Sequence, residues 1–212
     1  VKRYAESRLL EGAKCLSLYG RGSLDCLRPG VFQRRAEIGA DEVEVRVSCM
    51  SLNFRDVLNV MDMYPGDPGE PGCEYSGVVA RRGSNVTDIE VGDAVCSMGE
   101  GCLREYVYSH RLMVSKKPIS MSMEEAAAVP VVYCTVELAL RRAASISESD
   151  IVLIHAAAGG VGLCAVQYAL SRGARVFATA SESKQALLYD MGVEHVFDSR
   201  DSSTFSEGIR GV

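Results

Sequence analysis

The stretch His155-Ala156-Ala157-Ala158-Gly159-Gly160-Val161-Gly162 decides how this chain folds. Before it, the apolar and β-branched run 151–154 (Ile-Val-Leu-Ile) is typical of a strand buried on both faces of a parallel sheet. After it, the segment 163–172 carries small and apolar residues at helical spacing and stops at Gly173, a favourable residue just past a helix end. The order strand, glycine turn, helix predicts an anion site, because backbone N–H groups can approach a pyrophosphate at the positive end of the helix.

The glycine pattern matches the dinucleotide-binding fingerprint at two of its three glycine positions. Gly159 and Gly162 hold the second and third positions, while Ala157 stands at the first. An alternative interpretation is a turn that needs small residues only for packing. On the cofactor interpretation, the residues that meet the dinucleotide are Ala158, Gly159, Gly160, Val161 and Gly162.

The end of the next predicted strand, 174–180, indicates which dinucleotide binds. Proteins that bind NAD place an acidic residue there, about 20 residues after the glycines, on the ribose 2′-OH. Here Ser181 follows the strand, with Lys184 close behind and Glu182 one position late. A hydroxyl and a cation favour a 2′-phosphate, so NADPH is expected over NADH, although Lys184 as a solvated helix residue is an equal alternative. Arg200 is a further expected cofactor contact.

Composition and length describe a globular protein with one or two domains. The chain has 212 residues, 47% of them hydrophobic, which is enough to bury a sizeable core. Its net charge of −5 and the lack of any basic run argue against nucleic acid as a partner. The eight cysteines occur singly, without a CxxC pair, so free thiols in a reducing cytoplasm are expected and not disulfides or a metal site.

Two further stretches bear on location. The start, Val1 to Tyr4, lacks an initiator Met and a signal-like apolar core, which suggests an internal cut in a longer protein. The apolar run 151–170 has the hydropathy of a membrane span. Its Gly159-Gly160 pair and its change from strand to helix pattern argue against a membrane-spanning helix.

The first half of the chain has a different pattern. Residues 42–48 alternate, with three valines on one face and Glu42, Glu44, Arg46 and Ser48 on the other, as in a half-buried antiparallel strand. A short helix is predicted over 54–61, with Asn53 as its N-cap. The proline- and glycine-rich segment 64–72 is predicted to be a loop.

Short strands separated by glycine turns follow, and they predict a small antiparallel barrel or sandwich. They are expected at 75–80, 93–96 and 105–108. The fold class is therefore α/β, with an antiparallel β-barrel domain over 1–120 and a partial doubly wound parallel domain over 121–212. Helices predicted at 123–129 and 130–142 bridge the two parts.

Several motifs together resemble the enoyl reductase domain of modular polyketide synthases. They are Gly22-Ser23-Leu24-Asp25, Ser51-Leu52-Asn53-Phe54-Arg55-Asp56-Val57-Leu58, Met63-Tyr64-Pro65-Gly66-Asp67, Glu125-Ala126-Ala127-Ala128-Val129-Pro130-Val131-Val132 and the 156–162 motif, all in the same order. That domain belongs to the medium-chain dehydrogenase/reductase superfamily, near the quinone oxidoreductases. The resemblance implies a GroES-like barrel followed by a Rossmann domain.

The resemblance also implies an activity. Such domains use NADPH to reduce a trans-2-enoyl thioester carried on an acyl carrier protein, beside the other domains of a megasynthase. Hydride adds to the β-carbon and a proton to the α-carbon. Tyr64 matches the tyrosine implicated in delivering that proton, and the alternative for Tyr64 is a residue that only packs its loop.

Two more residues match cofactor-site positions of the family, and each has a structural alternative. Asn53 matches a residue at the nicotinamide site, or it serves only as a helix cap. Thr135 matches a threonine that borders the cofactor, or it is a plain helix residue. Zinc-dependent relatives carry a catalytic Cys and a His-Glu pair, where this chain has Phe54-Arg55-Asp56 and Cys73-Glu74, so no metal is expected.

The largest departure from the family is length. A complete Rossmann domain has about six parallel strands, whereas only three are predicted here, the third at 195–197. The sequence therefore resembles a fragment whose isolated activity is doubtful, and the family's other proposed proton donors, a lysine and an aspartate, have no counterpart in it. Two alternatives to the polyketide enoyl reductase stay open: a stand-alone quinone or alkenal reductase, and a nucleotide-binding or scaffold module without turnover.

Overall fold

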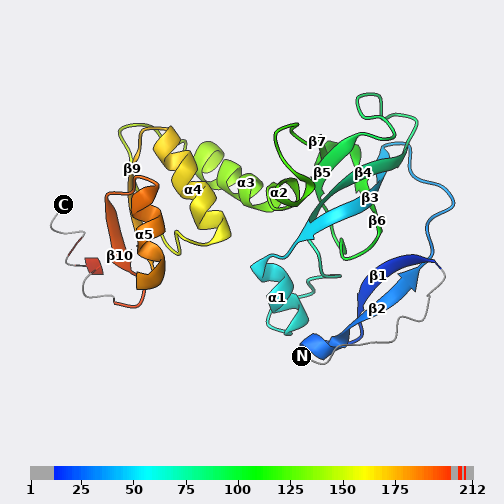
Figure 1. Ribbon diagram of the computed structural model, residues 1–212, viewed down its shortest axis with the longest axis horizontal. Coiled ribbons are helices and arrows are strands. Elements are labelled where there is room, and N and C mark those ends of the chain that lie inside the picture. The colour runs from blue at the N-terminus through cyan, green and yellow to red at the C-terminus, as the bar shows by residue number, and fades with distance from the viewer. Residues whose placement is uncertain (1–11, 202–204, 207, 209–212) are drawn as a thin grey trace. The chain divides into compact units, whose positions relative to one another are not determined.

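The structure is a computed structural model that describes residues 12–201, 205, 206 and 208. The chain divides into two compact units, Val1–Val131 and Val132–Val212 (Figure 1). We keep the domain limits predicted from the sequence, 1–120 and 121–212, as a proposal about which parts fold independently.

The first unit is built on two antiparallel sheets. The smaller pairs β1 (Ala13–Leu18) with β2 (Leu27–Phe32). The larger has five strands in the order β6-β3-β4-β5-β7, with bounds β3 (Glu42–Ser51), β4 (Glu74–Arg82), β5 (Ala94–Met98), β6 (Tyr106–His110) and β7 (Val114–Lys116). The predicted short strands separated by glycine turns are therefore confirmed, and the fold is the expected GroES-like one.

One predicted face of β3 is corrected. Val43 and Val45 are fully buried, as expected, in a core with Tyr75 and Val79. Glu44 was expected on the polar face, but it is fully buried as well. The reason is that Arg34 and Arg81 pair with the Glu44 carboxylate on that face of the strand. The local alternation of residues 42–48 cannot reveal partners from other parts of the chain.

The helices of the first unit are short. α1 (Phe54–Val60) begins at the predicted N-cap Asn53. α2 (Met123–Ala127) begins at Ser122 with a capping box, in which Ser122 and Glu125 each bind the other's backbone N–H. Two single 3₁₀ turns are η1 (Leu24–Cys26) and η2 (Arg111–Met113). The predicted loop 64–72 contains neither helix nor strand.

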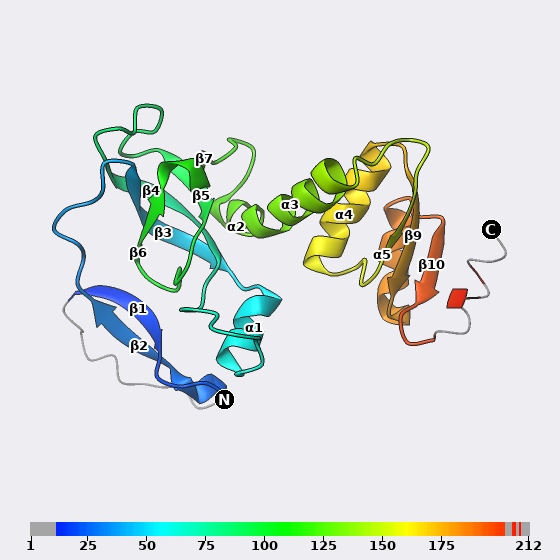
Figure 2. The ribbon, with the colours of Figure 1, turned by 180° about the vertical axis from the view of Figure 1, so that it is seen from behind.

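The second unit follows the predicted βα alternation. Its elements are β8 (Ile151–Ile154), α4 (Gly160–Ser171), β9 (Arg175–Ala180), α5 (Glu182–Asp190) and β10 (His195–Asp198). The strands are parallel in the order β10-β9-β8. The two opposite views show α5 on one side of this sheet (Figures 1 and 2), and the core on that side joins residues of α4 and α5 with those of the strands.

The helix that leads into this unit changes its winding. α3 (Pro130–Val136) is α-helical, and η3 (Glu137–Ala143) continues it as a π-helix. The single helix predicted over 130–142 is therefore present, but its second half is wider than an α-helix.

The expectation that the first parallel strand is buried on both faces is wrong. Ile154 is buried and Val152 packs against the helical core, but Ile151 is 63% and Leu153 39% exposed. Among the described strands, β8 lies at one edge of the sheet, and in this part of the chain its second face is incompletely covered.

The structure also bears on cysteine state and membrane crossing. All eight cysteines are free thiols. In the described part of the chain, no helix has both the length and the apolar character needed to cross a bilayer.

Candidate cofactor and substrate sites

The turn between β8 and α4 is held in an unusual backbone conformation. Ala156 has a φ of 50°, in the left-handed region that residues other than glycine seldom adopt. Its carbonyl accepts the N–H of Gly159 at 2.9 Å, and Gly159 is the N-cap of α4. Beyond this cap, the N–H groups of the first helical turn have no partner inside the helix, so they are available to an anion.

Two glycines of the motif serve different purposes. A Cβ at Gly162 would lie 2.4 Å from the Ala156 carbonyl oxygen and 2.6 Å from the Ala157 Cα, so this glycine lets the helix pack directly on the turn. A Cβ at Gly159 would meet only the Ala156 oxygen, at 3.2 Å, and Gly159 lines a pocket. A larger side chain at 159 would therefore fill that pocket.

This pocket, which we call the corner pocket, has a volume of about 230 Å³ and lies at the C-terminal ends of the parallel strands. It is lined by Ala156, Ala158, Gly159, Ala180, Ser181, Lys184, Ser199 and Arg200. The lining combines two cations, two hydroxyls and small residues, with no carboxylate. Such a lining suits a phosphorylated ligand at the edge where nucleotides bind in parallel sheets.

The polar groups of the corner pocket are left open by the fold. Ser181 is the N-cap of α5, yet its side chain makes no capping hydrogen bond. Lys184 and Arg200 are exposed, and among the described residues neither makes an ion pair. The backbone holds both in place, since the Lys184 N–H donates to the Ser181 carbonyl at 2.8 Å and the Arg200 N–H to Asp198 Oδ1 at 2.9 Å.

The corner pocket brings together five of the residues expected from the sequence: Ala158, Gly159, Ser181, Lys184 and Arg200. Gly160, Val161 and Gly162 form the first turn of α4 but are not among the residues that line the pocket. Ser199 lines it and was missed. It directly follows β10, and the rule that ligands bind beyond the carboxyl ends of parallel strands could have identified it.

Thr135 lies on α3 with an exposed side chain, and it is not part of the corner pocket lining. Its role beside a cofactor stays a prediction.

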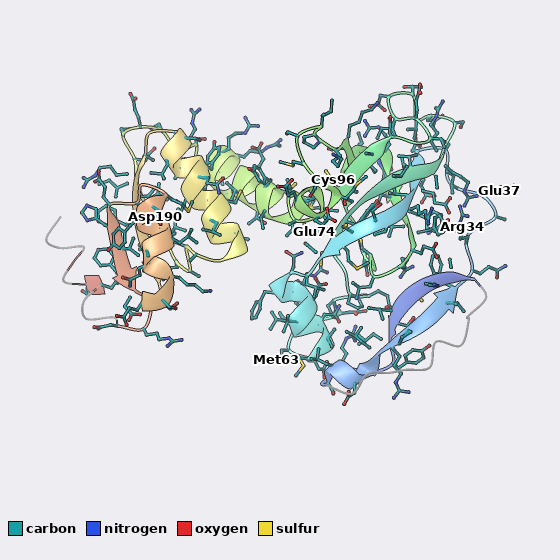
Figure 3. The ribbon with its side chains drawn as sticks, viewed as in Figure 1. Arg34, Glu37, Met63, Glu74, Cys96 and Asp190 are labelled. Atoms are coloured by element: carbon teal, nitrogen blue, oxygen red, sulfur yellow. The ribbon has the colours of Figure 1, made fainter. Side chains whose placement is uncertain are left out.

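The second region of interest surrounds the N-terminus of α1. The Asn53 N–H donates to Asp56 Oδ2 at 2.9 Å, which confirms Asn53 as the cap residue. Its side-chain Nδ2 donates to Glu74 Oε1 at 2.9 Å. Glu74 is buried near the start of β4 (Figure 3), and it also accepts hydrogen bonds from Ser51 Oγ and, at 2.8 Å, from the Val131 N–H. The Asn53 amide is therefore fixed in place by a buried carboxylate.

The loop that carries Tyr64 is tied to α1. The guanidinium of Arg55 lies over the Tyr64 ring, 5.3 Å from its centre, and donates to the Pro68 carbonyl at 3.2 Å. Asp56 Oδ1 accepts the Gly72 N–H at 2.7 Å. Tyr64 is half-buried, and in the described part of the chain no group forms a hydrogen bond with its hydroxyl. The ring of Tyr64 is therefore held in place.

The residues at the positions of the zinc ligands are committed to the fold. Burial and the neighbouring Asp56 raise the pKa of the Cys73 thiol to about 11, so this thiol is not a ready thiolate ligand. Within the residues that the structure describes, no group of three or more His, Cys, Asp or Glu side chains is placed to hold a metal ion.

Two family models match the chain. Residues 39–119 match the alcohol dehydrogenase GroES-like domain, and residues 160–212 match the zinc-binding dehydrogenase domain. A highly reducing polyketide synthase of Didymella fabae is 48% identical over 172 residues, which is 80% of this chain and 9% of that protein. The chain thus spans less than a tenth of the length of this relative.

Solved structures give the same assignment. The CurK enoyl reductase is 35% identical, with a TM-score of 0.89 over 95% of this chain and 64% of that one. Mycobacterial Rv1454c complexed with NADPH is 29% identical, with a TM-score of 0.82 over 94% of this chain and 62% of that one. Quinone oxidoreductases from Coxiella burnetii and Pseudomonas syringae are also similar. The chain belongs to the medium-chain dehydrogenase/reductase superfamily of oxidoreductases, where it is similar to the enoyl reductases of polyketide synthases and to quinone oxidoreductases.

Proposed function

We propose that this chain binds NADPH and forms part of an enoyl reductase that reduces a trans-2-enoyl thioester on an acyl carrier protein within a polyketide synthase. The single observation that carries the proposal is the corner pocket, where a glycine turn meets Ser181, Lys184 and Arg200. The 48% identity to a highly reducing polyketide synthase and the fit to the CurK enoyl reductase support the reaction class.

The residues of the corner pocket fit NADPH better than NADH. Bare backbone at Gly159 and the open first turn of α4 would hold the diphosphate. Lys184, Arg200 and the Ser181 hydroxyl would hold the 2′-phosphate, because charge-assisted hydrogen bonds favour a dianion over a ribose hydroxyl. The similar structure complexed with NADPH supports this choice of cofactor. When bound, NADPH would supply the hydride for the β-carbon.

Tyr64 is the proposed proton donor to the α-carbon. Its hydroxyl has no hydrogen-bond partner in the described part of the chain, while Arg55 fixes the ring from one side. A general acid must lie within hydrogen-bond reach of the atom that it protonates, and a held ring with an open hydroxyl supports that role. Asn53 and Thr135 remain proposed contacts of the cofactor.

We propose that the reaction does not need zinc. A zinc ligand must be deprotonated, and the raised pKa of Cys73 opposes this. Glu74, its neighbour, already accepts hydrogen bonds from Ser51, Asn53 and Val131. The proposed partners are the carrier protein and the neighbouring synthase domains, and the eight free thiols support a reducing, cytoplasmic setting.

Two measurements on the full chain and on the full-length protein that carries it test the proposal. NADPH is titrated first, followed by fluorescence, and a crotonyl thioester is then added while NADPH oxidation is recorded. Binding with thioester-dependent oxidation is expected. Absence of NADPH binding would refute the cofactor assignment, and binding without oxidation in both forms would favour a nucleotide-binding module without turnover.

A quinone reductase is the second candidate, because several similar structures are quinone oxidoreductases. The two candidates are separated by comparing kcat/KM for a crotonyl thioester with kcat/KM for a simple benzoquinone in the same preparation. A preference for the quinone would replace the proposed substrate class and leave the NADPH site intact.

A further inference from the structure

Thr179 joins the two walls of the corner pocket. It lies in β9 and its side chain is 4% exposed. The next two residues along the chain, Ala180 and Ser181, line the pocket from the end of β9, and Ala156, Ala158 and Gly159 line it from the turn after β8. Hydrogen bonds join Thr179 to that turn.

Three hydrogen bonds make this connection. The Ala157 N–H donates to the Thr179 carbonyl at 2.9 Å, which extends the pairing of β8 with β9. The Ala156 N–H donates to Thr179 Oγ1 at 3.3 Å, and His155 Nδ1 lies 3.1 Å from the same oxygen. A threonine hydroxyl can accept one N–H and donate its own proton to an imidazole nitrogen, so both contacts are satisfied at once.

The bond to Ala156 acts on a strained residue. An alanine with a φ of 50° lies in a conformation that side chains disfavour, and it persists only where its surroundings hold it. Thr179 Oγ1 holds its N–H, and its carbonyl accepts the Gly159 N–H at 2.9 Å. The Ala156 peptide units are therefore fixed on both sides, and the position where α4 begins depends on them.

We propose that Thr179 is a positioning residue for the dinucleotide pocket: its hydroxyl holds Ala156 in the left-handed turn and so fixes the backbone that receives the diphosphate. This inference rests on the proposed NADPH site. The inference goes beyond that site because Thr179 is buried and is not among the residues that line the pocket. Valine has nearly the same shape as threonine but cannot accept the Ala156 N–H, so the hydroxyl can be tested apart from packing.

The test measures Kd for NADPH and for NADH in the full chain carrying Thr179→Val, Thr179→Ser or no substitution. Loss of the bond to Ala156 is expected to weaken both cofactors by the same factor, about tenfold. Thr179→Ser restores the hydroxyl and should bind within about twofold of the unsubstituted chain. The equal loss separates a role at the diphosphate from one at the 2′-phosphate, which would affect NADPH alone.

A matched control is Ser109→Ala in the first unit. Ser109 is also a buried hydroxyl, 2.7 Å from the Tyr75 hydroxyl, so its loss should lower thermal stability without changing either Kd. A Thr179→Val chain that binds both cofactors normally would overturn the inference while leaving the proposed NADPH site standing. A Thr179→Ser chain as weak as Thr179→Val would also overturn it, and an unsubstituted chain that binds no NADPH would remove both.

A second measurement needs no substitution. Amide hydrogen exchange by NMR in the unsubstituted chain should show protection of the Ala156 N–H without cofactor, because Thr179 holds it. Exchange of that amide as fast as the open amides of the first turn of α4 would overturn the inference, even if Thr179→Val does not fold.

Discussion

One charged cluster in each unit shows a contrasting use of charge. In the first unit, the fully buried carboxylate of Glu44 receives Arg34 at 3.0 and 2.6 Å and Arg81 at 2.9 and 2.5 Å. In the second unit, Lys184 and Arg200 extend toward the corner pocket, and among the described residues no acid pairs with them. The first carboxylate is neutralised within the protein, whereas the two cations of the second unit line a pocket.

On the proposed function, the difference separates charges that serve stability from charges that serve binding. Burial alone would raise the pKa of Glu44, but the hydrogen bonds from Arg81 and Arg34 outweigh it and lower that pKa to about 2. A charge neutralised in this way contributes to folding and has little left for a substrate. Unpaired cations beside exposed backbone N–H groups contribute little to folding and can bind phosphate.

Filling the corner pocket should have the largest effect on cofactor binding. Gly159→Leu should raise the Kd for NADPH by more than about a thousandfold, because the side chain would occupy the volume of the diphosphate. The smaller Gly159→Ala places only a Cβ, 3.2 Å from the Ala156 oxygen, and should lose less. Fluorescence titration checks both variants, and circular dichroism checks that they are folded. Unchanged affinity in Gly159→Leu would remove the motif from the site.

Removing the charge of Glu44 should lower the stability of the fold and leave NADPH binding unchanged. Glu44→Gln leaves two guanidinium groups facing a neutral amide, and we expect the free energy of unfolding to fall by about 3 kcal/mol. Urea unfolding at neutral pH measures this loss. Affinity for NADPH, measured well below the unfolding midpoint, should stay unchanged. A loss below about 0.5 kcal/mol would show that Arg34 and Arg81 gain nothing from Glu44.

The hydrogen bonds from Arg34 and Arg81 to Glu44 predict a contribution to stability that is lost in acid. The folded-state pKa of Glu44 is about 2, against an ordinary value of 4.5, so its stabilising effect is fully present above pH 4.5. It is lost as the pH falls from 4.5 toward 2, where the folded carboxylate also takes up a proton. Urea unfolding across this range should therefore show a steeper decline for the unsubstituted chain than for Glu44→Gln. Parallel declines would contradict the assignment.

Local sequence patterns predicted most of the helices and strands, but they did not predict contacts between residues far apart in the sequence. The strand, turn and helix around Gly159 and the cap at Asn53 were predictable because each depends on neighbouring residues. The burial of Glu44 was not, since its partner Arg81 is 37 residues away. Ser199 directly follows β10, which was predicted as a strand, so the rule for carboxyl ends could have found it, but its place in the pocket also depends on the pairing of β10 with β9. The sequence of one strand does not show which other strand will lie beside it in the sheet.

The unpaired cations can be tested one at a time. Lys184→Ala should weaken NADPH by about thirtyfold, the value of one charge-assisted hydrogen bond, and change the Kd for NADH by less than about twofold. The selectivity follows because only NADPH carries the 2′-phosphate. Calorimetric titration of both cofactors gives the ratio. Equal losses for the two would assign Lys184 to the diphosphate or to the solvated face of α5.

Tyr64 lies in the same unit as the paired Glu44, but its hydroxyl is open, so it tests the role of an open polar group in that unit. Tyr64→Phe keeps the ring under Arg55 and should leave stability and NADPH affinity unchanged. Thioester reduction should slow by about tenfold, less than the roughly hundredfold usual for a general acid, because water can supply the proton. Protonation from water should also reduce the stereochemical purity of an α-substituted product, which chiral chromatography of the released acid measures. The same rate and configuration as in the unsubstituted protein would mean that Tyr64 only packs the loop.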